Sequence, residues 1–511
     1  MAVMVDPPPR DSADEGSAQP DGRAVATVSP AASPTAPPAP RLAEPPIPGG
    51  RVEALMGRLI RVLAHSRLAR PLPAVTLSAL GLGGVAFVGL CATAPQPSVA
   101  TPPVLLPLTS LARNAGAPHL PDIVANLIMY ASVGLCVLGL AMMLWANSRG
   151  WSPNPRRVFW TAAGAVAVLV NITPVGSSDA ASYAAYGRIA ALGYNPYTYL
   201  PISLPHQPFE VNPYTLLVSP QWRTMPSVYG PVSTWTHLLA AQIGGTRPWA
   251  TIWVLMIMIG AAFLLTGYVL LRTAANPTRA VLLWVANPLL ITELVIGGHM
   301  DAFVALFAIM AIVVSRRCTA PWHDVVVGLL VGMALGIKVS AGLLALGIAI
   351  PLMHDRSWAR LARTAAAAAA TTLGLYFFSY GWVAFKPLGS ASTMIISPTV
   401  WRAVEAIFGT GHVVTTVIGF TWPPLMLALA WYLYNRLSPD VPTVVAATCA
   451  LTFAWLVVAP WSLPWYSSIA WVALALLPRN TLTRWLTLAT GVLALLHFNG
   501  GHSTNVTQPF P

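Results

Sequence analysis

Apolar runs separated by short loops occupy most of the chain from about residue 74 to residue 498. Only 9% of the 511 residues carry charge, whereas an average soluble domain has about 25%. A soluble fold of this length cannot cover so much apolar surface with polar side chains, but a lipid bilayer accepts it. We therefore expect an all-α integral membrane protein, a polytopic helical bundle of about 13 transmembrane helices.

The expected spans share an apolar composition and are separated by short polar loops. They lie at about 74–93, 124–146, 157–174, 248–271, 280–297, 302–315, 324–337, 339–353, 364–384, 413–434, 442–459, 466–478 and 485–498. Several are shorter than the ~20 residues of a full span. A weakly apolar helix at about 230–244 is a further span or a re-entrant piece.

The chain divides into four parts by composition. Residues 1–50 are rich in Pro, Ala, Ser and Asp and cannot bury a core, so we expect a disordered cytoplasmic tail. Residues 51–73 mix arginines with apolar residues, which predicts a basic interfacial helix. The transmembrane domain covers 74–498 and includes a large outer loop at 175–247, and residues 499–511 form a short outer tail.

The basic residues indicate the orientation in the membrane. With a cytoplasmic N-terminus, 21 of the 28 Lys and Arg residues fall on the cytoplasmic side, in agreement with the positive-inside rule. The net charge of +12 then reflects membrane orientation, and nucleic acid is not expected as a partner. We expect a multi-pass plasma-membrane protein whose N-terminus is cytoplasmic.

In this orientation the isolated charges collect on the outer side, so we expect the functional site on that side of the membrane. They are Asp179, Glu210, Asp301, Glu405, Lys338, Lys386 and Arg402. The four cysteines, in contrast, are widely spaced and lack metal-ligand spacing, so we interpret them as packing residues. They are Cys91, Cys136, Cys318 and Cys449.

Asp179 directly follows an expected span and opens a short helix. Ser178 and Asp179 are placed to cap that helix, and Tyr183 and Tyr186 share its face with Asp179. One interpretation is a helix cap with an aromatic interface belt. The other is a partly desolvated carboxylate that acts as a general base for a sugar hydroxyl, in a cleft shaped by the tyrosines and Arg188.

Two further outer turns carry isolated charges. Glu293 lies within a span, where a carboxylate is costly and therefore a functional candidate, and the GGHMD turn adds His299 and Asp301. His299 and Asp301 either contact a phosphate or the acceptor, or they only form a polar turn between two helices. A metal site is weakly indicated, because this turn would need further ligands from elsewhere. Lys338 interrupts the apolar stretch ALGIKVSAG; it either snorkels to the surface or binds a lipid-linked phosphate.

The turns VYGPV and PWSLPWY bring aromatic residues to the same side. Tyr229, Trp465 and Tyr466 either anchor at the interface or stack on a sugar ring. The sequence lacks a Gly-rich nucleotide loop, a Walker motif, a Rossmann fingerprint and a DxD pair. A cytosolic nucleotide-sugar enzyme is therefore not expected, and an activated sugar would have to come from a polyprenyl phosphate.

The ordered motifs SSDAASYAAYGRIAALGYNPY, VYGP, ANPLLITELVIGGHMDAF, GIKVSAG and LPWYSSIAW span about residues 75–500. Taken together, they resemble the actinobacterial polyprenyl-phosphomannose-dependent α-(1→6)-mannopyranosyltransferases of the MptA/MptB type, in the GT-C class. The resemblance implies a GT-C-like fold with a catalytic first outer loop. It also implies inverting transfer of mannose from polyprenyl-phosphomannose to a lipid-anchored mannan, in lipomannan and lipoarabinomannan core assembly.

The resemblance implies Asp179 as the catalytic base and donor-side roles for His299, Asp301 and Lys338. With the reasoning from the residues, we assign the donor phosphate to Lys338, Arg188 and His299. Residues assigned to the acceptor or the sugar are Asp301, Glu293, Tyr183, Tyr186, Tyr229, Trp465 and Tyr466. No cofactor is expected, and a divalent cation is possible but not indicated.

Two other functions stay open at this stage. The first is a GT-C enzyme that uses another polyprenyl-linked sugar, such as arabinose, because pocket shape decides the sugar. A polyprenyl-lipid flippase or transporter would place charges at the midplane of broken helices, often with inverted repeats. The isolated charges of this chain lie instead at one membrane edge, and no convincing repeat is present.

Overall fold

The computed structural model describes residues 71–91, 105–118, 120–205, 211–317, 320–391, 394–396, 399–437 and 440–497. The predicted tails at 1–50 and 499–511 lie outside these residues, as do Glu210, Cys318 and all of the predicted interfacial helix except 71–73. Within the described part of the chain, all regular secondary structure is helical. The all-α prediction is therefore confirmed.

Four helices are long and apolar enough to cross a membrane: α2 (Pro71–Leu90), α4 (Asp122–Ser148), α10 (Pro248–Thr273) and α19 (His412–Asn435). A fifth crossing forms if α11 (Pro277–Leu283) and the helical stretch Pro288–Ile296 count as one span bent by 41°. That stretch comprises α12 (Pro288–Leu290) and the π-helical segment η3 (Ile291–Ile296). The chain is thus a helical membrane protein.

The other predicted spans also contain helices, although these are shorter or less apolar. They are α5 (Pro155–Leu169), α13 (Asp301–Arg317), α14 (Pro321–Leu335), α15 (Gly342–His354), α16 (Trp358–Tyr380), α20 (Thr443–Val458), α21 (Ser468–Leu476) and α22 (Leu482–His497). Two of them, α5 and α14, begin with proline, which suits the first helical turn because its missing N–H needs no partner there. The figure of 13 membrane crossings stays a prediction.

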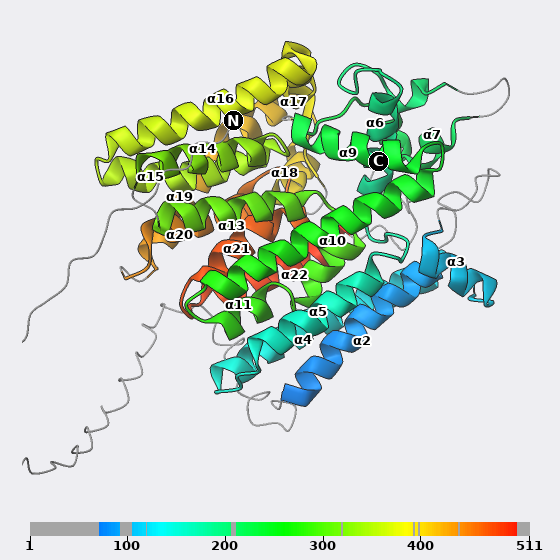
Figure 1. The fold of residues 1–511 in the computed structure, drawn as a ribbon, viewed down its shortest axis with the longest axis horizontal. Coiled ribbons are helices and arrows are strands. Elements are labelled where there is room, and N and C mark those ends of the chain that lie inside the picture. The colour runs from blue at the N-terminus through cyan, green and yellow to red at the C-terminus, as the bar shows by residue number, and fades with distance from the viewer. Residues whose placement is uncertain are drawn as a thin grey trace, which may run out of the picture. The chain divides into compact units, whose positions relative to one another are not determined.

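Small residues allow the helices to pack closely. In Figure 1, α2 and α4 run side by side. A Cβ atom added to Gly139 of α4 would lie only 2.4 Å from Ser78 Oγ of α2. A Cβ atom added to Gly81 of α2 would likewise lie only 2.7 Å from Cys136 Sγ of α4. Such contacts between small residues are the usual way that helices associate in membranes.

An ionic cluster joins α14 to α16 at the end of the bundle away from the predicted site. The buried carboxylate of Asp324 accepts hydrogen bonds from Arg360 Nε at 3.0 Å and from Arg363 Nη2 at 2.7 Å. Both arginines are among those predicted to face the cytoplasm. A buried carboxylate is stable only when it is paired in this way.

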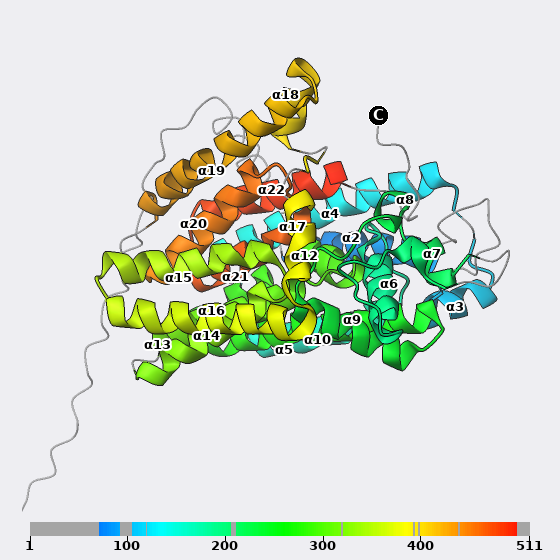
Figure 2. The same ribbon diagram turned by 90° about the horizontal axis from the view of Figure 1, so that it is seen from above.

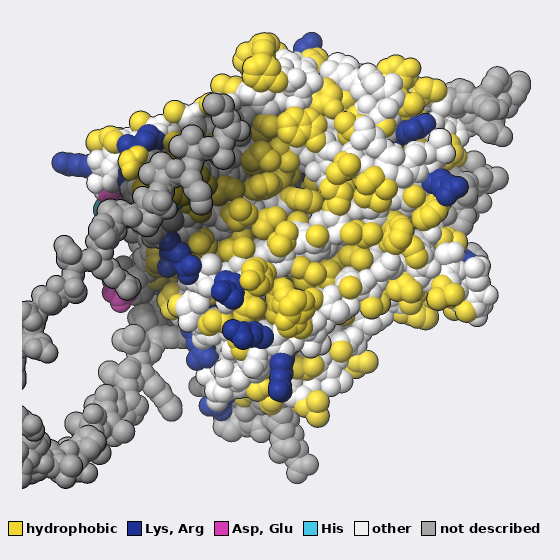
Figure 3. Space-filling model, in the orientation of Figure 1, with side chains coloured by type: hydrophobic (Ala, Val, Ile, Leu, Met, Phe, Trp, Pro, Cys, Tyr) yellow, Lys and Arg dark blue, Asp and Glu magenta, His cyan; other side chains and the backbone are white. Residues whose placement is uncertain are grey.

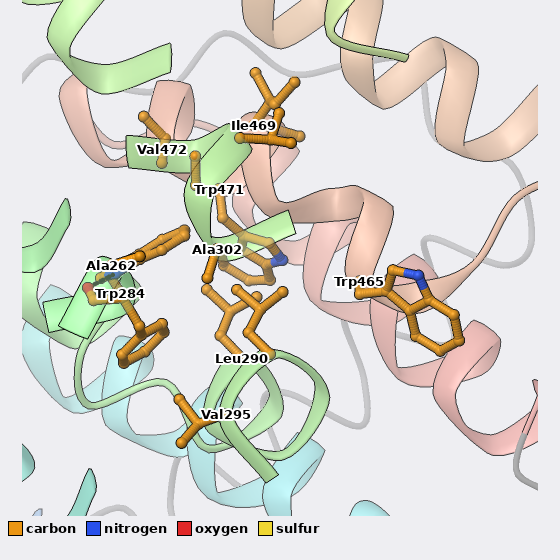
Figure 4. Packing of buried hydrophobic residues seen from close by; sticks show 14 of the residues in the cluster. Ala262, Trp284, Leu290, Val295, Ala302, Trp465, Ile469, Trp471 and Val472 are labelled. Atoms are coloured by element: carbon orange, nitrogen blue, oxygen red, sulfur yellow. Dashed lines mark hydrogen bonds between the residues drawn. The ribbon is translucent and has the colours of Figure 1, made fainter. Parts of the chain in front are cut away.

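The hydrophobic core fills the space between the helices with large aromatic side chains. Trp284 donates its indole N–H to the carbonyl of Phe263 at 2.8 Å, and Trp471 donates to Thr490 Oγ1 at 3.1 Å. Figure 4 shows Trp471 beside Leu290 and Ala302, whereas Trp465 lies apart from this group. Buried tryptophans need such partners for their N–H groups.

Apolar side chains also cover a broad outer face of the helices (Figure 3). Trp160 of α5 is 70% exposed and Leu265 of α10 is 52% exposed. An apolar surface of this extent fits contact with lipid. Inside the bundle, Cys91, Cys136 and Cys449 are buried and unpaired, as predicted for packing residues.

The predicted outer loop 175–247 folds into short helices at one end of the bundle. They are η2 (Pro201–Ser203), α6 (Asp179–Ala191), α7 (Pro213–Leu217), α8 (Pro220–Arg223) and α9 (Pro231–Gly244). Figure 2 shows α6, α7 and α8 gathered there, and α6 packs against both α9 and α10. The helix predicted at 230–244 corresponds to α9.

The remaining described segments connect the longer helices. They are α3 (Pro107–Asn114), η4 (Val339–Ala341), η5 (Trp382–Phe385), α17 (Lys386–Ala391), α18 (Val400–Phe408) and η6 (Pro464–Ser467). Two of them, η4 and η6, directly follow or contain predicted site residues.

Candidate active site

Asp179, the first residue of α6, is the centre of a cluster of polar and aromatic side chains. Its Oδ2 accepts hydrogen bonds from the hydroxyls of Tyr183, at 3.2 Å, and Tyr229, at 3.3 Å. Tyr183 lies one turn along α6, and Tyr229 precedes α9. The rings of the two tyrosines meet edge to face, with their centroids 4.9 Å apart. The carboxylate is thus oriented by two hydroxyls from different elements.

The predicted cap of α6 differs from the observed one. Ser178 occupies the N-cap position but makes no side-chain capping bond; its hydroxyl instead accepts from Ser219 at 2.8 Å. The adjacent Ser177 hydroxyl accepts the N–H of Asp179 at 3.2 Å. The capping role predicted for the Ser178 side chain was therefore wrong, since its hydroxyl bonds to Ser219 and not to a backbone N–H of α6.

Burial raises the pKa of the Asp179 carboxyl above its ordinary value of 3.8. The positive charge of Lys338 opposes this effect, as do the hydrogen bonds from Tyr183 and Tyr229. The Asp179 side chain is nevertheless 22% exposed, so a substrate can reach it. A raised pKa makes this carboxylate more basic than an ordinary aspartate.

Lys338 lies between α14 and η4 and forms a buried ion pair with Asp301, the first residue of α13. Its Nζ is 2.9 Å from Asp301 Oδ2, and the two side chains are 9% and 3% exposed. The Nζ also lies 3.5 Å from the ring centroid of Tyr466, within cation–π range. Lys338 therefore does not snorkel to the surface, which removes the alternative considered from the sequence.

Tyr229 links the two charged groups. Its hydroxyl is bonded to Asp179, and its ring centroid lies 5.9 Å from Lys338 Nζ. Tyr466 on η6 completes this side of the cluster, and its own hydroxyl is bonded to the indole N–H of Trp461 at 3.1 Å. The carboxylate and the ammonium group are thus held around one tyrosine ring.

His299 also lies close to Asp179, in the turn between η3 and α13. Its ring stacks on Trp465 with centroids 3.6 Å apart and an angle of 13° between the planes. Nδ1 is hydrogen-bonded to the backbone carbonyl of Glu293, and Nε2 lies 3.8 Å from Asp179 Oδ2. Gly298 has φ +71°, the left-handed conformation that glycine adopts without strain.

A small cavity lies beside this turn. Its lining includes Glu293, Thr292, His299 and His497. Glu293 belongs to the π-helical segment η3, and such segments occur frequently at functional sites. The structure thus places Glu293 next to His299, as the sequence analysis expected for a single site.

Two predicted site residues lie apart from the cluster. The Tyr186 hydroxyl donates to the carbonyl of Met225 at 3.1 Å, so this residue anchors the loop before Tyr229. Arg188 is bonded to the carbonyl of Gly245 at 3.5 Å, beside Tyr214, toward the other end of α6. The structure therefore does not bring Arg188 into the cluster around Asp179, and its role in donor binding stays a prediction.

Two histidines belong to the site but were not singled out in the sequence. His237 of α9 is fully buried and stacks on Tyr183 with centroids 4.8 Å apart. His497 of α22 meets Trp465 edge to face at 5.1 Å. A lone histidine in an apolar helix was the available signal for both. Among the described residues, no three His, Cys, Asp or Glu side chains form a metal-binding group.

Comparison with known proteins adds to this description. The sequence profile of a family described as α-(1→6)-mannopyranosyltransferase, N-terminal domain, matches residues 78–355. α-(1→6)-Mannopyranosyltransferase A of Corynebacterium glutamicum is 25% identical over 346 residues, covering 59% of this chain and 67% of that protein. The protein of the same name from Mycobacterium tuberculosis is 25% identical over 421 residues, covering 74% and 77%. No solved structure matches the chain significantly.

The apolar helices and these similarities together define a membrane protein of the glycosyltransferase class. The matched range covers more than half of the chain and contains Asp179, Tyr229, His299, Asp301 and Lys338. The chain belongs to the MptA/MptB family of α-(1→6)-mannopyranosyltransferases, which confirms the resemblance seen in the sequence. Trp465 and Tyr466 complete the site from beyond the matched range.

Proposed function

We propose that this protein transfers mannose from polyprenyl-phosphomannose to a lipid-anchored mannan acceptor, with inversion and formation of an α-(1→6) linkage. The step belongs to lipomannan and lipoarabinomannan core assembly. The observation that carries the proposal is the carboxylate of Asp179, oriented by two tyrosine hydroxyls and linked through Tyr229 to the buried Lys338. Membership of the family supports the sugar and the linkage.

In the proposed reaction Asp179 acts as the general base. A carboxylate whose pKa is raised by burial takes the proton of the acceptor 6-hydroxyl more readily than an ordinary aspartate does. The acceptor oxygen then attacks the anomeric carbon from the face opposite the phosphate. No covalent intermediate is needed, which accounts for inversion.

Lys338 is the residue proposed to stabilise the departing phosphate. An ammonium group has three donors, and the ion pair with Asp301 uses one of them. Stabilisation of the developing negative charge in a buried site is the main contribution that a transferase can make at the leaving group. Trp465 and Tyr466, which lie on η6 beside this group, are placed to contact the sugar.

The proposal includes a membrane orientation. About 13 spans with a cytoplasmic N-terminus would put the cluster at the extracytoplasmic side of the plasma membrane, within a GT-C-like fold. The ionic cluster at Asp324, Arg360 and Arg363 would then face the cytoplasm, in line with the positive-inside rule. Cysteine accessibility labelling from either side of the membrane tests this orientation.

Asp179→Asn tests the proposed function. In membranes supplied with polyprenyl-phosphomannose, we expect this variant to lose transfer while it stays folded. The matched control is Asp355→Asn, because Asp355 has a side chain that is 56% exposed and lies at the end of α15. Transfer by Asp179→Asn at the wild-type rate would exclude Asp179 as the base.

The same assay separates the other candidate functions. Purified protein given both mannose and arabinose donors, with linkage analysis of the product, identifies the sugar. Movement of a polyprenyl lipid across proteoliposomes without sugar transfer would indicate a flippase and overturn the proposal.

A further inference from the structure

His299 presents an acceptor nitrogen to Asp179. Its Nδ1 is hydrogen-bonded to the backbone carbonyl of Glu293, and because a carbonyl only accepts, Nδ1 carries the proton of the neutral ring. Nε2 is then unprotonated and lies 3.8 Å from Asp179 Oδ2. It is buried, and among the described residues it has no hydrogen-bond partner.

The His299 ring is held in this orientation from several sides. Trp465 covers one face of the ring at 3.6 Å, and the Glu293 carbonyl fixes one edge. On another side, a Cβ atom at Gly297 would lie 2.9 Å from the imidazole, so the backbone approaches the ring closely there. The free Nε2 therefore stays directed toward the Asp179 carboxylate.

We propose that His299 receives the proton that Asp179 removes from the acceptor hydroxyl, and that it acts through Asp179 instead of binding the donor phosphate. This inference rests on the proposed transferase function and differs from the donor role predicted from the sequence. A neutral imidazole whose only N–H is bonded to a backbone carbonyl has no proton to donate to a phosphate.

The transfer breaks one bond in the acceptor and one in the donor and forms a new glycosidic bond. The acceptor O–H bond breaks, and the acceptor oxygen forms a bond to the anomeric carbon. The bond from that carbon to the phosphate oxygen breaks, and its electron pair remains on the polyprenyl phosphate. The proton passes from the hydroxyl to the Asp179 carboxylate and then to Nε2 of His299, which leaves Asp179 ionised.

The charges around His299 change as the donor bond breaks. Burial lowers the pKa of the imidazole to about 3, so in the free protein the ring is neutral and is a weaker base than the Asp179 carboxylate. The hydrogen bond to the Glu293 carbonyl raises this pKa, and Lys338 lowers it. Negative charge that develops on the departing phosphate opposes these effects and favours the imidazolium.

The distance between the two groups is compatible with this role. Proton transfer needs a separation of about 2.6–3.2 Å, and catalytic hydrogen bonds in free proteins are often longer until substrate binds. The observed 3.8 Å requires a closure of about 0.6 Å to reach that range. A rotation of the Asp179 side chain away from the two tyrosine hydroxyls that hold Oδ2 would supply this closure.

His299→Gln distinguishes a proton acceptor from a phosphate ligand. We expect kcat to fall about 100-fold, in the range for loss of a proton-transfer group, with the KM for polyprenyl-phosphomannose changed by less than a factor of about three. His354→Gln is the matched control, since that side chain is 85% exposed. A raised donor KM with an unchanged kcat, or no change in either constant, would overturn the inference.

Two measurements give readouts that a purely structural role would not produce. Added imidazole should restore transfer to His299→Ala, because it fits the space beside Trp465. In wild-type protein, single-turnover rates in mixtures of light and heavy water should show a curved dependence, as two protons move. Absence of rescue together with a linear dependence would refute the relay.

These tests separate failure of the relay from failure of the proposed function. If wild-type protein transfers mannose and Asp179→Asn does not, the function stands whatever His299→Gln does. If wild-type protein transfers no mannose at all, the function and the relay both fall.

Discussion

The buried ion pair of Lys338 and Asp301 has an energy that a double-mutant cycle can measure. The two side chains are 9% and 3% exposed, with Nζ and Oδ2 separated by 2.9 Å. Removal of one partner leaves the other charge buried without its counter-ion, which costs about 3–5 kcal/mol. We expect Lys338→Met and Asp301→Leu each to lower the free energy of unfolding by that amount. The double variant leaves no charge unpaired, so it should lose no more than either single variant, which corresponds to a coupling energy of at least about 3 kcal/mol.

The assay is unfolding in mixed micelles by titration with SDS, followed by tryptophan fluorescence. The exposed pair of His354 and Asp355, with side chains 85% and 56% exposed, serves as the control and should show no measurable coupling. We also expect the double variant to remain inactive, since it lacks Lys338. A coupling energy below about 0.5 kcal/mol for the buried pair would refute the reasoning.

Three further predictions concern the surroundings of Asp179. Because the base must be ionised, the transfer rate should rise with pH through a midpoint above 3.8, and Lys338→Met should move any residual activity to still higher pH in a rate–pH profile. Tyr229→Phe removes one of the two hydrogen bonds that orient the Asp179 carboxylate. It should slow transfer about tenfold in the same kinetic assay, which corresponds to a loss of about 1.4 kcal/mol. Gly187→Ala should lower the melting temperature, because its Cβ would lie 2.2 Å from the His237 carbonyl oxygen, whereas Gly164→Ala, with open space around it, should not.

Much of the site follows from local sequence. Asp179 and Tyr183 are one helical turn apart, so a single amphipathic helix predicts that they meet. Counting membrane crossings also predicts that Asp301, Lys338 and Tyr466 lie on the same side of the membrane, and the structure places the three side chains together. That all of them would surround one carboxylate is a weaker expectation, since it depends on how the helices pack.

The sequence does not specify which charged groups pair. Lys338 is 37 residues from Asp301, and nothing in either motif selects this partner over Asp179 or Glu293. Arg188 was expected at the site because it shares α6 with Asp179, but it lies more than two helical turns away and bonds to Gly245 instead. The break between α11 and α12 was also missed, because an apolar run gives no signal when the backbone bends within it.

Sharing of Lys338 between a phosphate and Asp301 has a consequence for turnover. In the proposed reaction the donor is a phosphodiester with one negative charge, whereas the released polyprenyl phosphate is a monoester that carries about 1.5 to 2 negative charges at pH 7. The site offers this product one ammonium group already paired with a carboxylate, and Asp179 regains its own charge at the end of the reaction. Electrostatic repulsion between the product phosphate and the two carboxylates therefore increases as the reaction is completed. A site with an unpaired lysine would bind the released polyprenyl phosphate more tightly than this site does.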